Sequence, residues 1–544
     1  MARINIAIAT LLVLLTMPAF GNVNRYMVFF KDKKENPYTL AKPLEFLSAR
    51  ALERRQKQQI AIGAGDLPVS EHYLGQLRAI DSVQVSFASR WFNAVLVEMD
   101  EGKLEEVGSL PFVNTIKFVA PGSKLQPDAG NGRKSGQLDI ANTEEEEESK
   151  AQNEFIGVEE MHEQGYRGEG MLIGVFDSGF DEVDRSPYFS HLFENKKIKG
   201  ARDFVHGSSE VFRYDSHGSK VLSCISAWLP GEYSGTAPQA DVLLCVTEDV
   251  QSEFRIEEYN WLFAAEYADS AGVDIINSSV GYSYFDYESM DYSYADMDGN
   301  TAVITRAADM AAAKGILVVA SVGNEGKNTW KYLNAPSDGD SVLAIGAATF
   351  AQDKSAFSSF GPSSDHRIKP DIAALGTWVQ VVHNSELSTA NGTSFSSPMV
   401  AGLAAGLWQS FPHLSNMELM GYLVTTASQA DAPDTLLGYG IPDFIRAYNK
   451  IKVSEGDVVN SFVVFPNPVT NRRVISFYVE GIASPQSADL QFFDSKGSLI
   501  KTAIFESKNT DDPVEIDVSF LKPGAYILAL HIDGKARKSK LIVQ

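Results

Sequence analysis

The sequence predicts an α/β protein whose central part is a three-layer fold, with a mostly parallel sheet between two layers of helices. Short apolar runs, such as residues 171–176 and 316–320, have the length and composition of buried strands. They alternate with helical stretches such as 254–270 and 301–314. Polar residues follow several of these runs directly, which is where open α/β sheets place functional groups. A small α+β unit precedes this part, and a small β-sandwich follows it.

Overall size and charge restrict the kind of protein. The chain has 544 residues, which is enough for several domains, and 44% of them are hydrophobic. The formal net charge is −23, which argues against nucleic acid or an anionic membrane as the main partner. These numbers fit a soluble, exported protein of more than one domain.

The N-terminus has the pattern of a secretory signal peptide. Arg3 provides a positive start, residues 4–17 are apolar, and Ala19 and Gly21 are small residues two positions apart. We expect residues 1–21 to be removed by cleavage after about Gly21. This apolar run is shorter than the about 20 residues that cross a bilayer, and no other run is long enough, so no stable membrane span is expected.

Residues 22–119 form the predicted α+β unit. A charged amphipathic helix is indicated over 44–58 and a short one over 102–107. Strands are indicated at 26–30, 83–87, 93–98 and 113–119.

A linker is predicted over residues 120–152. This segment has no apolar period and contains the acidic run 144–148. The acidic run is interpreted as a solvated spacer, with calcium binding as the alternative. A connector of this kind is also where a maturation cleavage would separate the flanking units.

Ser394 stands at the start of a predicted buried helix. It follows Gly392 and Thr393, and an apolar run with Pro398 near its beginning comes next. Proline is tolerated in the first helical turn, where its missing N–H is not needed. Free N–H groups and the positive end of the helix dipole would stabilise an oxyanion beside the hydroxyl. Taken alone, however, such a serine is also a common helix cap.

Three further residues supply what a nucleophilic serine requires. His217, in an Asp-Ser-His-Gly-Ser motif, is the candidate base, and Asp177, directly after the strand 171–176, is the candidate acid. The order Asp, His, Ser is one of the known orders of the catalytic triad. Asn324, in a Gly-Asn-Glu-Gly motif, offers a side-chain amide to the oxyanion. Each residue alone has an ordinary structural interpretation, but four of them in this order favour catalysis.

These motifs resemble those of the subtilisin-like serine proteases, the peptidase S8 family. The Asp-x-Gly motif appears at 177–179, His-Gly-[Thr/Ser] at 217–219, Gly-Asn-x-Gly at 323–326 and Gly-Thr-Ser-x-x-x-Pro at 392–398. Weaker marks lie at 237–238, 277–281, 360–362 and 369–371. The resemblance covers roughly residues 155 to 450. It implies a subtilisin-like three-layer catalytic domain over 153–452, with Asp177, His217 and Ser394 as the triad and Asn324 as an oxyanion donor.

The resemblance also gives an expected role to the flanking unit. An α+β unit directly before such a domain is similar to the family's inhibitory propeptide and folding chaperone. Residues 22–119 are therefore expected to mask the active site until the linker 120–152 is cut. The alternative is a permanent accessory domain.

Two backbone segments resemble the edges that bind substrate as an added strand in this family. They contain the expected substrate-binding residues Ser279, Val280, Gly281, Ser321 and Gly323. The segment 282–300 follows the first edge, is rich in Tyr and Asp, and has no apolar period, so it is predicted to be a surface loop near the substrate cleft.

Metal and cysteine chemistry are minor features of the sequence. Asp296, Asp298 and Asn300 alternate like the oxygen ligands of a calcium loop, so structural calcium is the one candidate cofactor, and none is required for the reaction. Cys224 and Cys245 are the only cysteines. They form either a disulfide or two buried free thiols, because the sequence does not give their distance.

Residues 460–544 have short alternating strands separated by turns, which predicts a small β-sandwich. The segments 466–468, 521–526 and 538–544 resemble parts of the C-terminal sorting domain carried by cargo of the type IX secretion system. A carbohydrate-binding or adhesive module is the competing interpretation.

Together these observations predict a secreted serine endopeptidase, made as a zymogen, that acts through an acyl-enzyme intermediate. The expected partners are protein or peptide substrates, its own propeptide and the type IX secretion machinery. The expected location is outside the cell or on its surface, after export through the periplasm and outer membrane. Two alternatives are a non-enzymatic surface protein on a protease-like scaffold, and the same chemistry directed to ligation or esterolysis. Substrate preference is not predicted, because no charged residue is assigned to the floor of the specificity pocket.

Overall fold

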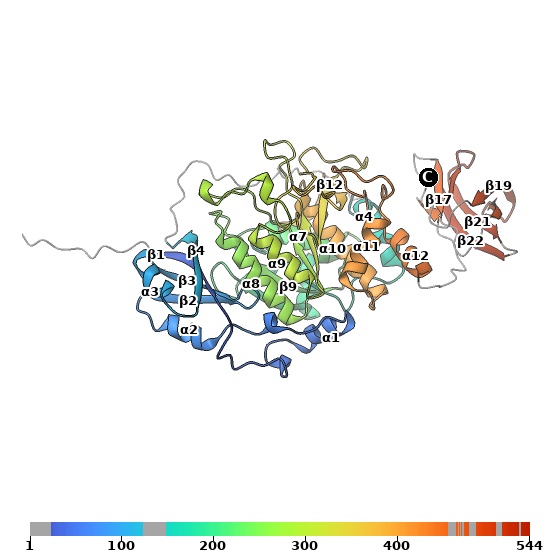
Figure 1. Cartoon of the computed structure of the whole chain (residues 1–544). Helices are drawn as coiled ribbons and strands as arrows, with labels where there is room; N and C mark the ends of the chain where they lie inside the picture. Colours follow the sequence, from blue (N-terminus) through green and yellow to red (C-terminus); the bar gives the residue numbers. More distant parts are fainter. Residues whose placement is uncertain are drawn as a thin grey trace, which may run out of the picture.

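The computed structural model describes residues 23–122, 148–454 and most of 464–543 (Figure 1). The predicted signal peptide lies outside the described residues, as do most of the predicted linker, Pro466 and Pro468. Where the linker was expected to continue to residue 152, the structure has a helix, α4 (Glu148–Glu154). Gln152 on this helix is buried and accepts a hydrogen bond from the Gln380 backbone N–H at 2.9 Å, so this end of the segment packs on the central domain.

The N-terminal unit is an antiparallel sheet with two helices on one face. The strand order is β2-β3-β1-β4, and the helices α2 and α3 contribute to the same apolar cluster as the sheet. The elements are β1 (Val23–Phe30), α2 (Glu71–Arg78), β2 (Val83–Ser89), β3 (Ala94–Asp100), α3 (Leu104–Gly108) and β4 (Val113–Pro121). The four strands and the short helix expected after residue 102 are all present.

A further helix of this unit, α1 (Ala49–Lys57), lies apart from the sheet and packs against helix α8 (Ile256–Ala271) of the central domain (Figure 1). Arg54 and Arg55 of this helix are buried, whereas Arg50 is partly exposed. Arg54 and Arg55 both pair with Asp269 of α8, at 2.5 and 2.9 Å. Arg90, at the turn between β2 and β3, pairs with the same carboxylate. The N-terminal unit is thus joined to α8 by charged groups that are removed from water.

The central domain contains a seven-stranded sheet in the order β13-β12-β11-β10-β5-β9-β6, and every neighbouring pair is parallel. The strands are β5 (Leu172–Asp177), β6 (Ile198–Asp203), β9 (Asp241–Val246), β10 (Ile275–Ser278), β11 (Leu317–Ser321), β12 (Val342–Ala348) and β13 (Ile372–Leu375). The predicted parallel sheet is confirmed.

Helices cover both faces of this sheet. Alternate strand residues show the two faces: Ile173 and Val175 of β5 pack with α7 and α10, while Leu172 and Phe176 pack with α8 and α9. The helices and hairpin strands are α5 (Val158–Glu163), α6 (Ser190–Glu194), α7 (His217–Ser226), β7 (Trp228–Leu229), β8 (Tyr233–Ser234), α9 (Val303–Ala312), β14 (Val379–His383), β15 (Glu386–Ala390), α10 (Thr393–Ser410), α11 (Asn416–Thr425) and α12 (Phe444–Ser454).

The segment 282–300 differs from the surface loop that was expected. It has only two short 3-10 turns, Glu288–Met290 and Tyr294–Asp296, but several of its side chains are buried in the cluster under α8 and α9. The buried residues are Tyr282, Phe285, Met290, Tyr292 and Met297. Scattered aromatic residues can fill gaps one at a time without any helical or strand period, so the sequence pattern did not reveal this packing.

The C-terminal part consists of two small sheets whose described apolar residues share one cluster. One sheet has the order β16-β17-β20 and the other β19-β18-β21-β22. Their strands are β16 (Val464–Phe465), β17 (Val474–Phe477), β18 (Gln486–Phe493), β19 (Leu499–Ser507), β20 (Val514–Asp517), β21 (Gly524–Ile532) and β22 (Lys535–Val543). A small β-sandwich was predicted, and two facing sheets are what the described residues form. No helix within the described ranges is long and apolar enough to cross a membrane.

Candidate active site

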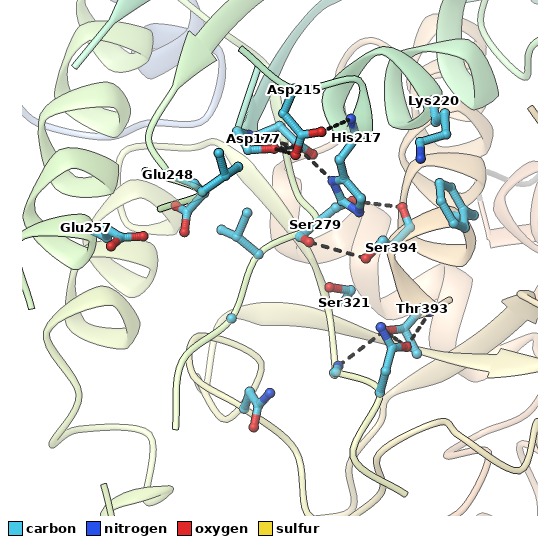
Figure 2. A pocket seen from close by; sticks show the side chains of 18 of the residues that line it. Asp177, Asp215, His217, Lys220, Glu248, Glu257, Ser279, Ser321, Thr393 and Ser394 are labelled. Atoms are coloured by element: carbon cyan, nitrogen blue, oxygen red, sulfur yellow. Dashed lines mark hydrogen bonds and ion pairs between the residues drawn. The ribbon is translucent and has the colours of Figure 1, made fainter. Parts of the chain in front are cut away.

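One edge of the central sheet carries the candidate site. Because all seven strands are parallel, the carboxyl ends of β5, β9, β10 and β11 meet at the same edge. A cavity of about 570 Å³ lies there, and we call it the site cavity (Figure 2). All nine candidate catalytic and substrate-binding residues line it: Asp177, His217, Ser279, Val280, Gly281, Ser321, Gly323, Asn324 and Ser394. Segments more than 200 residues apart in the sequence are therefore brought together.

Asp177 and His217 form a buried pair. Asp177 is the last residue of β5 and is fully buried, and His217 is the first residue of α7. His217 Nδ1 and Asp177 Oδ1 are 2.7 Å apart (Figure 2). The same carboxylate oxygen also accepts hydrogen bonds from the Ser178 backbone N–H and hydroxyl, at 2.8 and 3.1 Å. These contacts fix the aspartate and, through it, the orientation of the imidazole.

The charge on His217 is set by two opposing effects. Burial disfavours the charged imidazolium, but the Asp177 carboxylate stabilises it by charge and by hydrogen bonding, so the pKa of His217 is raised. Lys220, one turn further along α7, acts in the opposite direction. The pair is therefore arranged to accept a proton at the imidazole.

Ser394 is the second residue of α10 and is almost fully buried. Its hydroxyl donates to the Ser279 carbonyl oxygen at 3.4 Å, and Figure 2 shows the side chain beside the His217 ring. The aromatic ring of the next residue, Phe395, lies 5.9 Å from the imidazole, centroid to centroid. Gly392, the residue directly before α10, has φ 154°, a conformation that residues with side chains rarely adopt. This conformation lets the chain turn sharply into the helix.

Pro398 is not in the first helical turn, as was expected, but is the sixth residue of α10. A proline there removes the N–H that would normally bond to the carbonyl four residues earlier, which is that of Ser394. The Ser279 hydroxyl donates to this carbonyl instead, at 2.9 Å. Ser279 therefore compensates for the proline and fixes the first turn of α10 against the end of β10.

Asn324 follows the end of β11 and faces the start of α10. Its Oδ1 accepts hydrogen bonds from the Thr393 backbone N–H at 2.9 Å and from the Thr393 hydroxyl at 3.1 Å. Thr393 Oγ1 also accepts from the Gly323 N–H at 3.3 Å. Because the oxygen is used in this way, the Nδ2 group of Asn324 is the end left to donate into the site cavity.

The calcium candidates take part in local turns. Asp296 accepts from the backbone N–H and hydroxyl of Ser293, and Asp298 accepts from the N–H groups of Asn300 and Thr301 and from the Thr301 hydroxyl. These bonds account for the shape of the loop and use Asp296 Oδ2 and both Asp298 oxygens, which a cation would need as ligands, so the residues do not fit a calcium site well. Calcium at this loop stays a prediction.

Three carboxylates, which we call the acidic wall, line the site cavity on the Asp177 side: Glu248, Glu253 and Glu257. Their carboxylate oxygens lie within 4.8 Å of one another. Among the described residues, this cluster is the one group of three or more His, Cys, Asp or Glu side chains that lie close enough together to hold a metal ion. Glu248 accepts from the Tyr282 and Thr247 hydroxyls, and Glu257 accepts from the Phe254 N–H. Burial raises the pKa of both Glu248 and Glu257, which favours their protonated forms.

Both cysteines are buried and free in the structure. Cys224 belongs to the cluster on the α7 side of the sheet and Cys245 to the cluster on the α8 side, so the sheet separates them. Of the two alternatives left open by the sequence, the structure contains the free thiols and not the disulfide.

Several residues of the site were missed from the sequence. The sequence motif indicates no separate role for Thr393, yet its N–H and hydroxyl orient Asn324. Glu248 comes two residues after strand β9, as a polar residue at a carboxyl strand end, and that signal could have identified it. Asn334 also lines the site cavity, but it lies in an irregular segment where no local pattern indicated a function.

The chain matches known families over three consecutive regions. Residues 168–440, half of the chain, match the Subtilase family. Residues 25–135 match the peptidase S8 propeptide domain of Bacteroidota, and residues 463–544 match the secretion system C-terminal sorting domain.

Individual relatives are moderately similar. The chain is 28% identical to subtilisin DY of Bacillus licheniformis over 275 residues, which cover 50% of this chain and 89% of that protein. It is 29% identical to subtilisin E of Bacillus subtilis (strain 168) over 274 residues, which cover 49% of this chain and 63% of that protein. Among solved structures, that of MycP1 from the ESX-1 type VII secretion system aligns at 20% identity with a TM-score of 0.46, covering 58% of this chain and 89% of that one.

The C-terminal sorting domain indicates export, followed by secretion or attachment to the cell surface. The propeptide domain indicates synthesis as a zymogen. With a family match over half of its length, the chain belongs to the subtilase family and is a serine endopeptidase.

Proposed function

We propose that peptide hydrolysis is carried out by Ser394, His217 and Asp177, with Asn324 as oxyanion donor. The observation that carries this assignment is the 2.7 Å contact between His217 and Asp177 in the same cavity as the Ser394 hydroxyl at the start of α10. This geometry supports roles for Ser394 as nucleophile, His217 as base and Asp177 as the group that orients the base.

The reaction follows from these roles. The Ser394 hydroxyl oxygen attacks the carbonyl carbon of the scissile bond while His217 Nε2 takes the hydroxyl proton. The tetrahedral intermediate collapses, the C–N bond breaks, and the imidazolium gives the proton to the departing amine. Water then attacks the acyl-enzyme carbonyl while His217 takes its proton, the bond to the Ser394 oxygen breaks with return of the proton to that oxygen, and the carboxylate product is released. Asp177 holds Nδ1 protonated and stabilises the imidazolium formed in each half of the reaction.

Negative charge develops on the carbonyl oxygen during both steps. Asn324 Nδ2 and the backbone N–H of Ser394 are the proposed donors to it, because Thr393 keeps the Asn324 oxygen turned away. A donor of this kind stabilises the transition state by about 3 kcal/mol.

The remaining parts fit a sequence of maturation steps. Residues 1–21 direct export, residues 22–119 act as the inhibitory propeptide, and a cut within 120–152 frees the catalytic domain 153–452. Residues 460–544 are recognised by the type IX secretion machinery. The acyl-enzyme is hydrolysed by water. The expected substrates are proteins or peptides, and the reaction requires no cofactor.

The pH dependence of the reaction is expected to follow His217. Only the neutral imidazole accepts the serine proton, and its pKa is raised above the ordinary value of about 6.5. kcat/KM should therefore be low in acid and rise with pH through a midpoint above about 6.5. Replacing Lys220 by methionine removes a cation that disfavours the imidazolium, so the midpoint should move to higher pH in a full pH–rate profile. A midpoint that moves to lower pH would contradict the assignment.

A fluorophosphonate probe tests the nucleophile directly. We expect the purified mature enzyme to take up one equivalent, and peptide mapping to find the adduct on Ser394, because only an activated hydroxyl reacts. The denatured protein is the control and should stay unlabelled. An adduct confined to another serine, or the absence of any adduct in a protein that cleaves peptides, would refute the proposed role.

A further inference from the structure

Asn334 is a buried polar residue in the site cavity that the proposed reaction does not use. Its exposed fraction is 2%, and its side-chain Oδ1 has no hydrogen-bond partner among the described residues. It nevertheless lines the cavity together with Ser394 and Asn324. A carboxamide has both a donor and an acceptor end, so an unpaired one inside a protein is unusual.

The backbone fixes Asn334 between the two substrate-binding edges. On one side, its N–H donates to the Val322 carbonyl oxygen at 3.0 Å. On the other side, the next residue, Ala335, exchanges backbone hydrogen bonds with Tyr282, at 2.9 and 3.2 Å. Asn334 therefore spans the gap between the chain beyond β10 and the chain beyond β11.

Two glycines leave the space that the Asn334 side chain occupies. A β-carbon added to Gly323 would lie 2.7 Å from Asn334 Nδ2, and one added to Gly281 would lie 3.2 Å from Asn334 Cβ. Gly323 also has φ 102°, which disfavours any other residue there. The carboxamide is thus held at the floor between the edges 279–281 and 321–323.

A substrate carbonyl placed for attack by Ser394, with its oxygen toward Asn324, runs between these same edges. The side chain on that residue then projects between the edges toward their floor, where Asn334 lies. The acidic wall lines a different part of the same cavity from the start of α10: Figure 2 shows Glu248 and Glu257 on the opposite side of Ser279 from Ser394. The group that meets this substrate side chain is therefore a neutral amide and not a carboxylate.

We infer that Asn334 is a specificity-determining residue that selects a carboxamide side chain, glutamine or asparagine, on the residue that supplies the scissile carbonyl. A second carboxamide satisfies the donor and the acceptor of Asn334 at the same time. An apolar side chain leaves the buried Oδ1 of Asn334 unpaired, and sites built to hydrogen-bond a substrate group strongly reject analogues that lack it. This inference rests on the proposed function of Ser394 and Asn324.

The test compares internally quenched peptides that differ only at this residue, with glutamine or with methionine of similar length. For the mature enzyme, kcat/KM should be roughly tenfold to a hundredfold higher for the glutamine peptide. The Asn334→Leu variant keeps the branched shape and the number of heavy atoms of the side chain, and it should prefer the methionine peptide. Asn195→Ala, which changes an exposed asparagine outside the cavity, should keep the preference of the unmodified enzyme.

Equal cleavage of the two peptides by the unmodified enzyme would overturn this inference, and so would an unchanged preference in Asn334→Leu. If Asn334→Leu does not fold, Asn334→Ser supplies the same comparison, and its glutamine preference should be lost. A failure of the proposed function looks different: no peptide of the set is cleaved and no fluorophosphonate adduct forms on Ser394.

Discussion

Replacing Ser394 by alanine is expected to lower kcat about a million-fold, to the level that binding and the oxyanion donors alone provide. The alanine has no oxygen to attack the carbonyl, while His217 and Asp177 stay in place. If the linker is cut by the enzyme's own active site, the full-length precursor should also accumulate. Steady-state cleavage of a peptide mixture and N-terminal sequencing of the purified protein measure the two effects.

Ser396→Ala is the matched control for this experiment. Ser396 lies two residues further along α10, and it does not line the site cavity. Its hydroxyl is buried and has no hydrogen-bond partner in the part of the chain that the structure describes. Removing that hydroxyl should leave kcat within a few-fold of the unmodified enzyme. Hydrolysis retained by Ser394→Ala and lost in Ser396→Ala would show that another residue is the nucleophile.

Replacing Asp269 by alanine is expected to destabilise the zymogen by about 3–5 kcal/mol, because it removes a buried counter-ion that three arginines share. Asp269 is fully buried and pairs with Arg54, Arg55 and Arg90 of the N-terminal unit. Urea unfolding of the full-length chain measures the loss. The Ser394→Ala background is suitable where the linker is cut by the enzyme's own active site, since the propeptide then stays attached.

Glu53→Gln is the control on the same helix. Among the described residues Glu53 forms an ion pair with Lys57 alone, and both side chains are more than half exposed, so the unfolding midpoint should not change. Asp269→Asn keeps the size of the side chain and removes only the charge. If both Asp269 variants unfold at the midpoint of the unmodified chain, the buried ion pairs do not hold the propeptide on α8.

Much of the site was accessible from local sequence. Asp177, His217, Asn324 and Ser394 stand in short motifs at strand or helix ends, and such positions are set by nearby residues. The alternation of apolar runs likewise predicted a parallel sheet with helices on both faces. These patterns do not indicate which residues from distant parts of the chain contact each side chain.

The missed features all depend on distant partners. Residues 44–58 were predicted as a charged amphipathic helix, but nothing local showed that Arg54 and Arg55 are buried, because their partner Asp269 is more than 200 residues away. Pro398 lies beyond the first helical turn, where it leaves the Ser394 carbonyl oxygen without its helical donor. Nothing local indicates that the Ser279 hydroxyl donates to this oxygen instead. In both cases a group that is unfavourable by itself is stabilised by a contact between separate elements.

The sequence by itself determined the family, the order of the domains and the candidate residues for the chemistry, because nucleophilic catalysis requires particular residue types in short fixed motifs. Tertiary structure alone decided the environment of those residues: the floor at Asn334, the acidic wall, the free thiols on opposite faces of the sheet and the propeptide arginines buried at α8. The physical reason is that burial, charge pairing and hydrogen-bond satisfaction are properties of neighbours in space, and folding chooses those neighbours from any part of the chain.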